Sequence, residues 1–320
     1  MTETPAGAGG NEQPQHPQPT ERARALVRGG YDLHVHVGPD VMPRRINDLE
    51  LARRFHAYGL AGFALKSHYT STAERAAVVR AAVPGVNVIG AITLNRAVGG
   101  LNPLAVDIAA REGARIVWMP TFDALNETAG RVPPAPGAKL PFWARIQHEL
   151  REQGMASDPI QVVDETGQVV PEVRQVLSVI ARHDIALATG HMGRDEIFAV
   201  VAAANEEGVR RIIITHPEFP SQNLSARDQV ALAEQGAYLE HCLVTAYTGK
   251  TTWDTMFANI RATGPERTLI STDLGQPDNP PVEDGLALMA DRLLQAGFSE
   301  DEVHTMIVTN SVRLAERRQA

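Results

Sequence analysis

Short apolar segments alternate with amphipathic ones along almost the whole chain, and this alternation constrains the fold more than any other feature. Eight apolar segments have the length of strands, at residues 31–37, 62–66, 87–94, 114–119, 185–191, 211–216, 237–241 and 268–273. Several contain continuous apolar runs, such as IVWM at 116–119, which is typical of parallel strands covered by helices. Eight strand–helix units in about 300 residues predict a (β/α)8 TIM barrel over residues 23–320. An open, doubly wound sheet is the alternative, but no glycine-rich phosphate loop follows the first strand.

Two segments fall outside this alternation. Residues 1–22 are rich in Pro, Gly, Gln, Glu and Thr and offer little to bury, so we expect a disordered tail. Residues 120–171 form a long connection after the fourth strand, with a proline-rich stretch at 132–141 and a predicted hairpin at 159–171 that turns at 164–167. Because loops of this length usually cover a site, we predict a lid over the barrel mouth.

Charge and composition exclude several classes of partner. The formal net charge of −8 leaves no basic excess to meet the phosphates of a nucleic acid. No apolar run approaches the roughly 20 residues that span a bilayer, and the first residues do not resemble a signal peptide. The single cysteine, Cys242, excludes an internal disulfide and a cysteine-based zinc cluster. We therefore expect a cytoplasmic protein with a small-molecule substrate and neither a nucleic-acid nor a membrane partner; a homo-oligomer is compatible with the sequence.

Four histidines and one aspartate fall at the carboxyl ends of predicted strands. His34 and His36 are one residue apart on the first strand, so both imidazoles point to one face, about 7 Å apart at the backbone. His191 and His216 end the fifth and sixth strands, and Asp273 ends the eighth. Active sites of such barrels lie at this face. Imidazoles with a carboxylate suit Zn²⁺ or another transition metal better than Ca²⁺ or Mg²⁺, so we predict that these five residues bind metal.

This set of residues resembles the amidohydrolase superfamily of metal-dependent hydrolases. The resemblance spans about residues 30–315, including VTNSVRLAE at 308–316, which is similar to a helix that often follows the barrel. It implies one or two Zn²⁺ ions, with Mn²⁺ or Fe²⁺ as alternatives. His34, His36 and Asp273 would hold the first ion. His191 and His216 would hold a second ion if one is present, and otherwise one or both would orient the substrate. By the same resemblance, Asp273 passes a proton from the attacking water to the leaving group, and the reaction is hydrolysis of an amide, cyclic amide, lactone or related ester.

The sequence departs from that pattern at the fourth strand. Many two-metal members carry a carboxylated lysine or a glutamate there, whereas this strand ends in WMP at 118–120. The second strand instead ends in KSH at 66–68. Three roles are open: a carbamylated Lys66 that bridges the metals, a cationic Lys66 that binds a substrate anion, or Lys66 and His68 polarising the scissile group beside a single ion. A lysine at a barrel mouth could also point to solvent.

Other candidates lie in the loops and at the seventh strand. His241 ends that strand and is predicted to line the pocket, and Gln276 is predicted to contact substrate, although a role in the turn fits it equally. Glu240 precedes His241, and only one of the two can face the barrel interior. Arg44 and Arg45 follow the first strand and could meet an anionic substrate or only solvent.

Three further functions compete with the hydrolase. The KSH segment is similar to the second-strand histidine motif of PHP-type phosphoesterases. A metal-dependent decarboxylase would use one ion and a cation for the substrate carboxylate, for which Lys66 is suited. The third alternative is a barrel that binds a ligand without turnover, which the complete set of ligand positions argues against.

Overall fold

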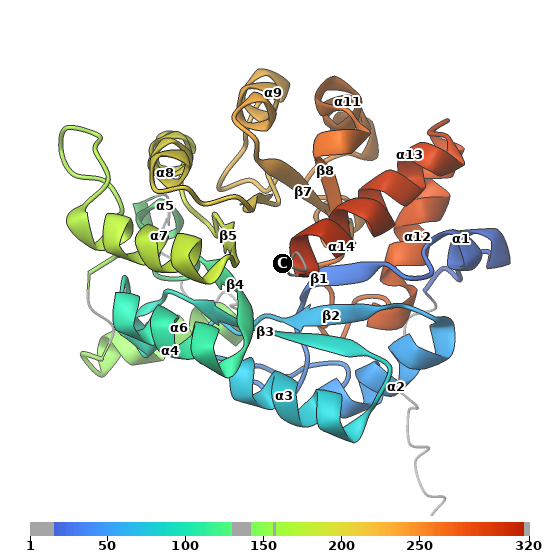
Figure 1. The fold of residues 1–320 in the computed structure, drawn as a ribbon, viewed down its shortest axis with the longest axis horizontal. Coiled ribbons are helices and arrows are strands. Elements are labelled where there is room, and N and C mark those ends of the chain that lie inside the picture. Colours follow the sequence, from blue (N-terminus) through green and yellow to red (C-terminus); the bar gives the residue numbers. More distant parts are fainter. Residues whose placement is uncertain (1–15, 130–141, 156–157, 317–320) are drawn as a thin grey trace, which may run out of the picture.

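The computed structural model describes residues 16–129, 142–155 and 158–316. Residues 1–15 of the predicted tail and the proline-rich stretch at 132–141 therefore lie outside the described residues. Eight parallel strands, paired in chain order, confirm the predicted TIM barrel (Figure 1). They are β1 (Tyr31–Val35), β2 (Gly62–Leu65), β3 (Asn87–Thr93), β4 (Ala114–Trp118), β5 (Ala186–Ala188), β6 (Ile212–Thr215), β7 (Tyr238–Cys242) and β8 (Thr268–Ser271).

The eighth strand returns to the first through the residues that follow it. The amide of Asp273 donates to the carbonyl of His34, and the amide of His36 donates to the carbonyl of Leu274, both at 2.8 Å. Gly275 has a φ of +131°, and a Cβ there would lie 1.5 Å from the carbonyl oxygen of His36. Only glycine can take that backbone conformation at so close an approach. The end of β8 is thereby fixed against the end of β1.

Helices cover the outside of the barrel (Figure 1). The main ones are α2 (Asp48–Tyr58), α3 (Ala73–Ala82), α4 (Pro103–Glu112), α7 (Pro171–His183), α8 (Arg194–Glu206), α9 (Ala226–Glu234), α11 (Trp253–Thr263) and α12 (Val282–Gln295). The remaining α-helices are α1 (Glu21–Leu26), α5 (Leu125–Ala129), α6 (Phe142–Glu152), α10 (Leu243–Tyr247), α13 (Glu300–His304) and α14 (Asn310–Ala315). None of the helices within the described ranges is both long and apolar enough to cross a membrane.

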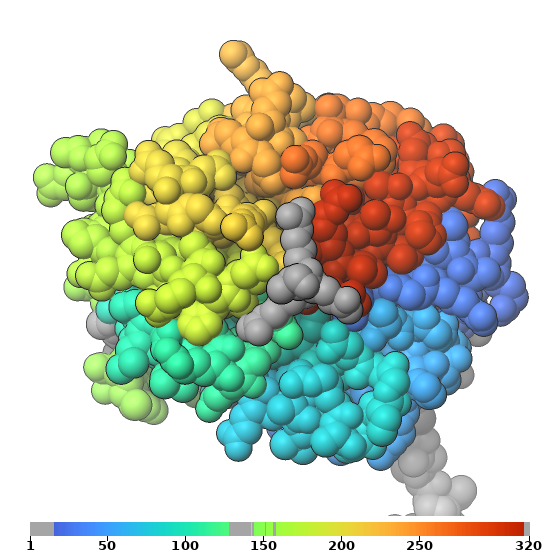
Figure 2. Space-filling view, viewed as in Figure 1, coloured from blue at the N-terminus to red at the C-terminus, as the bar shows by residue number. Residues whose placement is uncertain are grey.

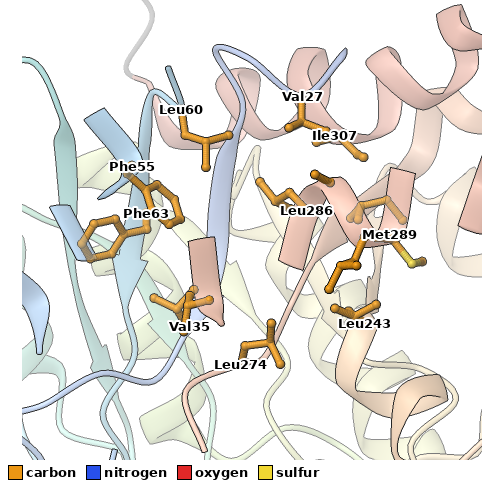
Figure 3. Packing of buried hydrophobic residues seen from close by; sticks show 14 of the residues in the cluster. Val27, Val35, Phe55, Leu60, Phe63, Leu243, Leu274, Leu286, Met289 and Ile307 are labelled. Carbon is orange, nitrogen blue, oxygen red and sulfur yellow. The ribbon is translucent and has the colours of Figure 1, made fainter. Parts of the chain in front are cut away.

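Apolar side chains fill the space between strands and helices. In Figure 3, Val35 of β1 and Phe63 of β2 belong to the same cluster as Leu286 and Met289 of α12. Each of these residues is almost completely buried, and burial of a side chain of this size contributes about 1.5–3 kcal/mol. Because the strands bury apolar residues toward the helices as well as toward the barrel interior, their sequences read as continuous apolar runs.

The amino-terminal end of the barrel is closed by the last helix. Leu314 and Ala315 of α14 pack with the side chains inside the barrel, and Ser311 accepts a hydrogen bond from the amide of Tyr31 at 3.0 Å. Helix α14, in red in Figures 1 and 2, lies over this end of the barrel. The predicted post-barrel helix is thus confirmed. Because it covers the amino-terminal end of the barrel, a site can form only at the carboxyl ends of the strands.

Two details concern the predicted tail and lid. Helix α1 begins at Glu21, inside the stretch predicted as a tail, because Thr20 accepts from the amide of Ala23 and donates to Asp291 of α12.

In the long connection after β4, the predicted hairpin turn forms where the amide of Gly167 donates to the carbonyl of Asp164 at 3.0 Å. The described part of this connection also contains α5 and α6 and supplies side chains to the barrel mouth.

Candidate metal centre and active site

The ends of β1 and β8 bring two imidazoles to one carboxylate. His34 Nε2 lies 3.2 Å and His36 Nε2 3.1 Å from the same oxygen, Oδ1 of Asp273. Asp273 has a positive φ of 54°, a backbone conformation that costs energy and is found mostly where a side chain must be aimed. Although burial raises the pKa of Asp273, the two histidines hold it well below its usual range. The predicted convergence of these three residues is therefore present in the structure.

The chemistry of these three donors fits a transition metal. Two ligands on a tetrahedral Zn²⁺ with bonds near 2.0–2.1 Å are about 3.4 Å apart, close to the nitrogen–oxygen distances at this cluster. Burial, and then Arg44, lower the pKa of His36 well below its usual value, so its imidazole is neutral and keeps a lone pair. His34, His36 and Asp273 could thus hold one ion.

Glu240 orients His34 from within the barrel. Its Oε2 lies 3.1 Å from His34 Nδ1, and both side chains are buried. A histidine that donates one ring N–H to a carboxylate presents the other nitrogen to a metal. Burial and the Lys66 ammonium lower the pKa of His34, but Asp273 and Glu240 outweigh them, so the pKa is raised.

Lys66 lies inside the site rather than in solvent. Its side chain is 1% exposed, and its Nζ lies 2.9 Å from His34 Nε2. Burial lowers the pKa of Lys66, while Asp273 and Glu240 oppose that shift. An ammonium that donates to His34 Nε2 occupies the lone pair that a metal ion needs. The charge of Lys66 and metal binding at His34 are therefore coupled.

His68 is held by a chain of hydrogen bonds. Its Nδ1 lies 2.8 Å from Thr121 Oγ1, which accepts from Asn95 Nδ2 at 2.7 Å. The orientation of the Asn95 amide is fixed because its Oδ1 accepts from the amide of Thr121. The Thr121 hydroxyl is fully buried, and within the described chain His68 Nδ1 is the acceptor in reach of its proton. The proton of a neutral His68 therefore resides on Nε2, and Phe122 stacks on the ring at 3.9 Å.

His191 and His216 form a neighbouring pair. Their ring centroids are 5.0 Å apart, and His216 lies 5.9 Å from the ring of His34. Glu127 of α5 contacts His191 Nδ1 at 3.0 Å. Burial, followed by His191, lowers the pKa of His216 well below its usual value, and no described residue bonds to His216 Nδ1. The two imidazoles could hold a second ion or contact a substrate.

These groups border a cavity of about 420 Å³, a volume that suits a small molecule. Gln276 lines it and also donates to the carbonyl of Asp273 at 2.9 Å, so this residue has both a turn contact and a cavity position. The cavity residues with polar or charged side chains are His36, Arg44, Lys66, His68, Glu127, His191, His216, Thr248, Lys250, Asp273, Gln276 and Asn279, and the apolar ones are Met42, Phe122, Phe219 and Val244.

The structure corrects the expectation for His241. Its Nδ1 lies 2.9 Å from Glu218, which also accepts from Asn259 of α11, so His241 faces the helices. Among the described residues that line the cavity, His241 is absent. Since neighbouring strand residues point to opposite sides, Glu240 occupies the interior position instead. The alternation was visible in the sequence, but it did not say which of the two faced inward.

Other residues of the site escaped the sequence analysis. Thr121, Asn95 and Glu127 lie in connections after β3 and β4, and their contacts with the histidines form only through the fold. Asp40, which binds Arg44, lies in the loop after β1. The sequence contained no spacing that could have singled out these residues.

Solved structures share this fold at low sequence identity. An amidohydrolase from Pseudomonas aeruginosa aligns with a TM-score of 0.61 and 12% identity over 92% of this chain and 98% of its own. A lactonase from Listeria monocytogenes aligns at 0.54 and 13%, covering 92% of this chain and 97% of its own. The phosphotriesterase homology protein from Escherichia coli aligns at 0.54 and 12%, covering 90% and 99%. At these identities, the three likenesses show a shared barrel fold.

The family assignment comes from the sequence. No curated protein matches the chain. Residues 29–240, which include the first seven strands up to Glu240, match the model of a family of unknown function, DUF6282. Because this match covers more than half of the sequence, the chain belongs to the DUF6282 family.

Proposed function

We propose that this protein is a metal-dependent hydrolase that cleaves an amide, cyclic amide, lactone or related ester of a small molecule. The observation that carries the proposal is the approach of His34 Nε2 and His36 Nε2 to a single oxygen of Asp273 at the edge of a cavity. A divalent ion held by these residues, for which Zn²⁺ is our first choice and Mn²⁺ or Fe²⁺ the alternatives, would lower the pKa of water toward about 7 and supply hydroxide near neutral pH.

Asp273 is the proposed proton carrier. Its carboxylate faces the two imidazoles and also lines the cavity, so it can touch both a ligand sphere and a substrate. The low pKa described above keeps the carboxylate ionised and able to accept a hydrogen bond from the attacking water. In this proposal Asp273 takes that proton and delivers it to the leaving group.

His68 is the proposed donor to the substrate oxygen. Thr121 and Asn95 fix its proton on Nε2, and burial, followed by Lys66, lowers its pKa well below the usual value. A neutral imidazole with a fixed N–H stabilises negative charge that develops on a carbonyl oxygen. His191 and His216 hold a second ion in this scheme or, with a single ion, orient the substrate.

Lys66 has two remaining roles, and they predict opposite results. A neutral, buried amine can take up carbon dioxide, and the resulting carbamate would offer oxygen ligands to the ion. A cationic Lys66 would instead compete with the ion at His34 and stabilise the oxyanion or a substrate anion. Replacement of Lys66 by Met should weaken metal binding in the first case and strengthen it in the second. Intact-protein mass spectrometry under gentle conditions would show the mass of one added carbon dioxide in the first case.

Metal content is the first test of the proposal. Wild-type protein loaded with Zn²⁺ should retain it through gel filtration, and His36→Ala should lose most of it, because one of three donors of the cluster is removed. His56→Ala, which removes an exposed histidine on α2, serves as the matched control and should retain the metal. Full retention by His36→Ala would contradict the assignment.

Turnover is the second test. The metal-loaded protein should hydrolyse members of a panel of lactones, cyclic amides and esters, and Asp273→Asn should keep the fold while losing turnover. Phosphate esters and the release of carbon dioxide belong in the same panel. Activity confined to phosphate esters would favour the phosphoesterase alternative, and carbon dioxide release would favour a decarboxylase.

A further inference from the structure

The cavity presents cationic groups on some of its loops and phenyl rings on others. The loops after β1 and β7 supply Arg44 and Lys250, whereas the connections after β4 and β6 supply Phe122 and Phe219. We propose that this arrangement selects a small substrate that carries a carboxylate on a flat, apolar body, with Arg44 as the anchor of the carboxylate. The inference rests on the proposed hydrolase function, because it concerns the substrate class of the same cavity.

Arg44 has the properties of a built anion anchor. Its side chain is only 4% exposed, and Nε and Nη2 both lie 2.7 Å from Oδ2 of Asp40. Nη2 also lies 3.4 Å from His36 Nδ1, so the guanidinium lies beside the metal cluster. In the part of the chain that the structure describes, Nη1 has no partner, and Arg44 lines the cavity. A planar guanidinium held by one carboxylate offers its remaining N–H groups in the geometry that a second carboxylate accepts.

Asp40 positions the guanidinium of Arg44 and does not prevent it from binding an anion. The Asp40 side chain is 2% exposed and is not among the described residues that line the cavity. It therefore holds the guanidinium from behind. The next residue shows the contrast, because Arg45 Nη1 donates to the carbonyls of Pro277 and Asn279, and Arg45 does not line the cavity but only a surface depression that Arg44 also borders. The structure thus separates two arginines that the sequence left equivalent.

Lys250 adds a basic side chain at the entrance, beyond the buried Arg44 and Lys66. It is exposed, and its Nζ lies 4.2 Å from the centre of the Phe219 ring. An exposed charge near a cavity attracts an oppositely charged ligand over a distance and contributes more to the association rate than to affinity. Lys250 should therefore steer the ligand, while the buried Arg44 holds it.

The other charged groups of the cavity do not reverse this preference. Its two carboxylates, Glu127 and Asp273, are engaged with histidine nitrogens at 3.0–3.2 Å. The apolar surface comes from Phe122, which stacks on His68, and from Phe219, whose ring lies 4.8 Å from that of His216. A carboxylate attached to a flat apolar group matches both the positive charge and the rings.

Benzoate is the probe, and benzyl alcohol is its uncharged match. Isothermal titration of Zn²⁺-loaded protein should show binding of benzoate and much weaker binding of benzyl alcohol. Removal of both buried charges in Asp40→Asn/Arg44→Gln avoids leaving an unpaired carboxylate, and it should lower the benzoate affinity roughly 10- to 100-fold. Lys250→Gln should lower affinity less and reduce its dependence on salt. Arg53→Gln, an exposed charge removal on α2, should leave benzoate binding unchanged.

The result that overturns the inference is unchanged benzoate affinity in Asp40→Asn/Arg44→Gln. Direct coordination of benzoate to the metal is the competing explanation: binding that disappears from metal-free wild-type protein but persists in the double variant would also overturn it. Failure of the hydrolase proposal gives another pattern, in which the wild-type protein retains no metal but still binds benzoate through Arg44. That pattern would support the anion site without the metal chemistry.

Discussion

The contact between Glu240 and His34 offers the sharpest test of the metal centre. Glu240→Gln keeps the shape of the side chain and removes its charge. The contact is 3.1 Å long, and both groups are buried, so water cannot replace the lost interaction. A glutamine oxygen can still accept from His34 Nδ1, but it no longer raises the basicity of Nε2. Loss of such an outer partner typically lowers metal affinity by about 10- to 100-fold, which corresponds to about 1.4–2.7 kcal/mol.

The chain provides a matched control for this variant. Glu218 and His241 form a second buried Glu–His pair at 2.9 Å, on the helix side of β7 and away from the cavity. Glu218→Gln makes the same chemical change, but it acts on His241, the residue that follows Glu240 on β7. Zn²⁺ affinity should be measured for both variants by titration against a competing chelator, with urea unfolding of the metal-free proteins as a check of the fold. Glu240→Gln should weaken Zn²⁺ binding, and Glu218→Gln should leave it unchanged.

Two outcomes would refute this reasoning. If Glu240→Gln bound Zn²⁺ as tightly as the wild-type protein, Glu240 would not orient a metal ligand, and His34 would lose its assigned role. If both variants lost affinity equally, the effect would come from general loosening of β7 rather than from the contact with His34.

Three further predictions address the closure of the barrel, the donor histidine and acid stability. Gly275→Ala should destabilise the protein and release metal, seen by thermal unfolding and elemental analysis, because a Cβ would lie 1.5 Å from the carbonyl oxygen of His36. Thr121→Val should lower kcat and change KM little, since the hydroxyl that fixes the proton of His68 is removed while the cavity keeps its shape. An unchanged kcat, or a rise in KM as large as the fall in kcat, would argue against the donor role. His241, Asn259 and Gln229 hold the pKa of Glu218 below its ordinary value of 4.5 despite burial, so its stabilising contribution is present above pH 4.5 and is lost as the pH falls. Urea unfolding from pH 7 to 3 should therefore show a smaller loss of stability in Glu218→Gln than in the wild-type protein.

The barrel could be predicted because its strands are buried on both faces. Such strands produce apolar runs that stand out between amphipathic helices, and all eight were located. The boundaries were less accurate at the fifth strand, which was expected at 185–191 but ends at Ala188. Gly190 takes a φ of +61°, and a Cβ there would lie 2.4 Å from the carbonyl oxygen of Met119. The chain turns at this glycine, so His191 reaches the site from a loop rather than from the strand.

The histidines and Asp273 could be predicted to meet because residues at strand ends converge in a barrel whatever their distance in sequence. The groups that support them could not. Thr121, Asn95 and Asp40 lie in loops, where no periodicity fixes the direction of a side chain, and hydroxyl and amide groups are common at such positions for local turn contacts. Their roles appear only from the hydrogen bonds to His68 and Arg44.

The choice between Glu240 and His241 shows where strand periodicity stops being informative. In a sheet with one face in water, polar residues mark the outer face and the buried face is known from the sequence. In β7 both faces are covered, because Tyr238 packs inside the barrel and Leu239 packs toward the helices. Since both residues are apolar, they do not indicate whether Glu240 or His241 points into the barrel. The direction is set by the pairing of Tyr238 with Ile213, whose side chain also lies inside the barrel. Because this register places Glu240 against His34, the strand supplies the carboxylate that orients a metal ligand, and His241 serves the packing of the helices instead.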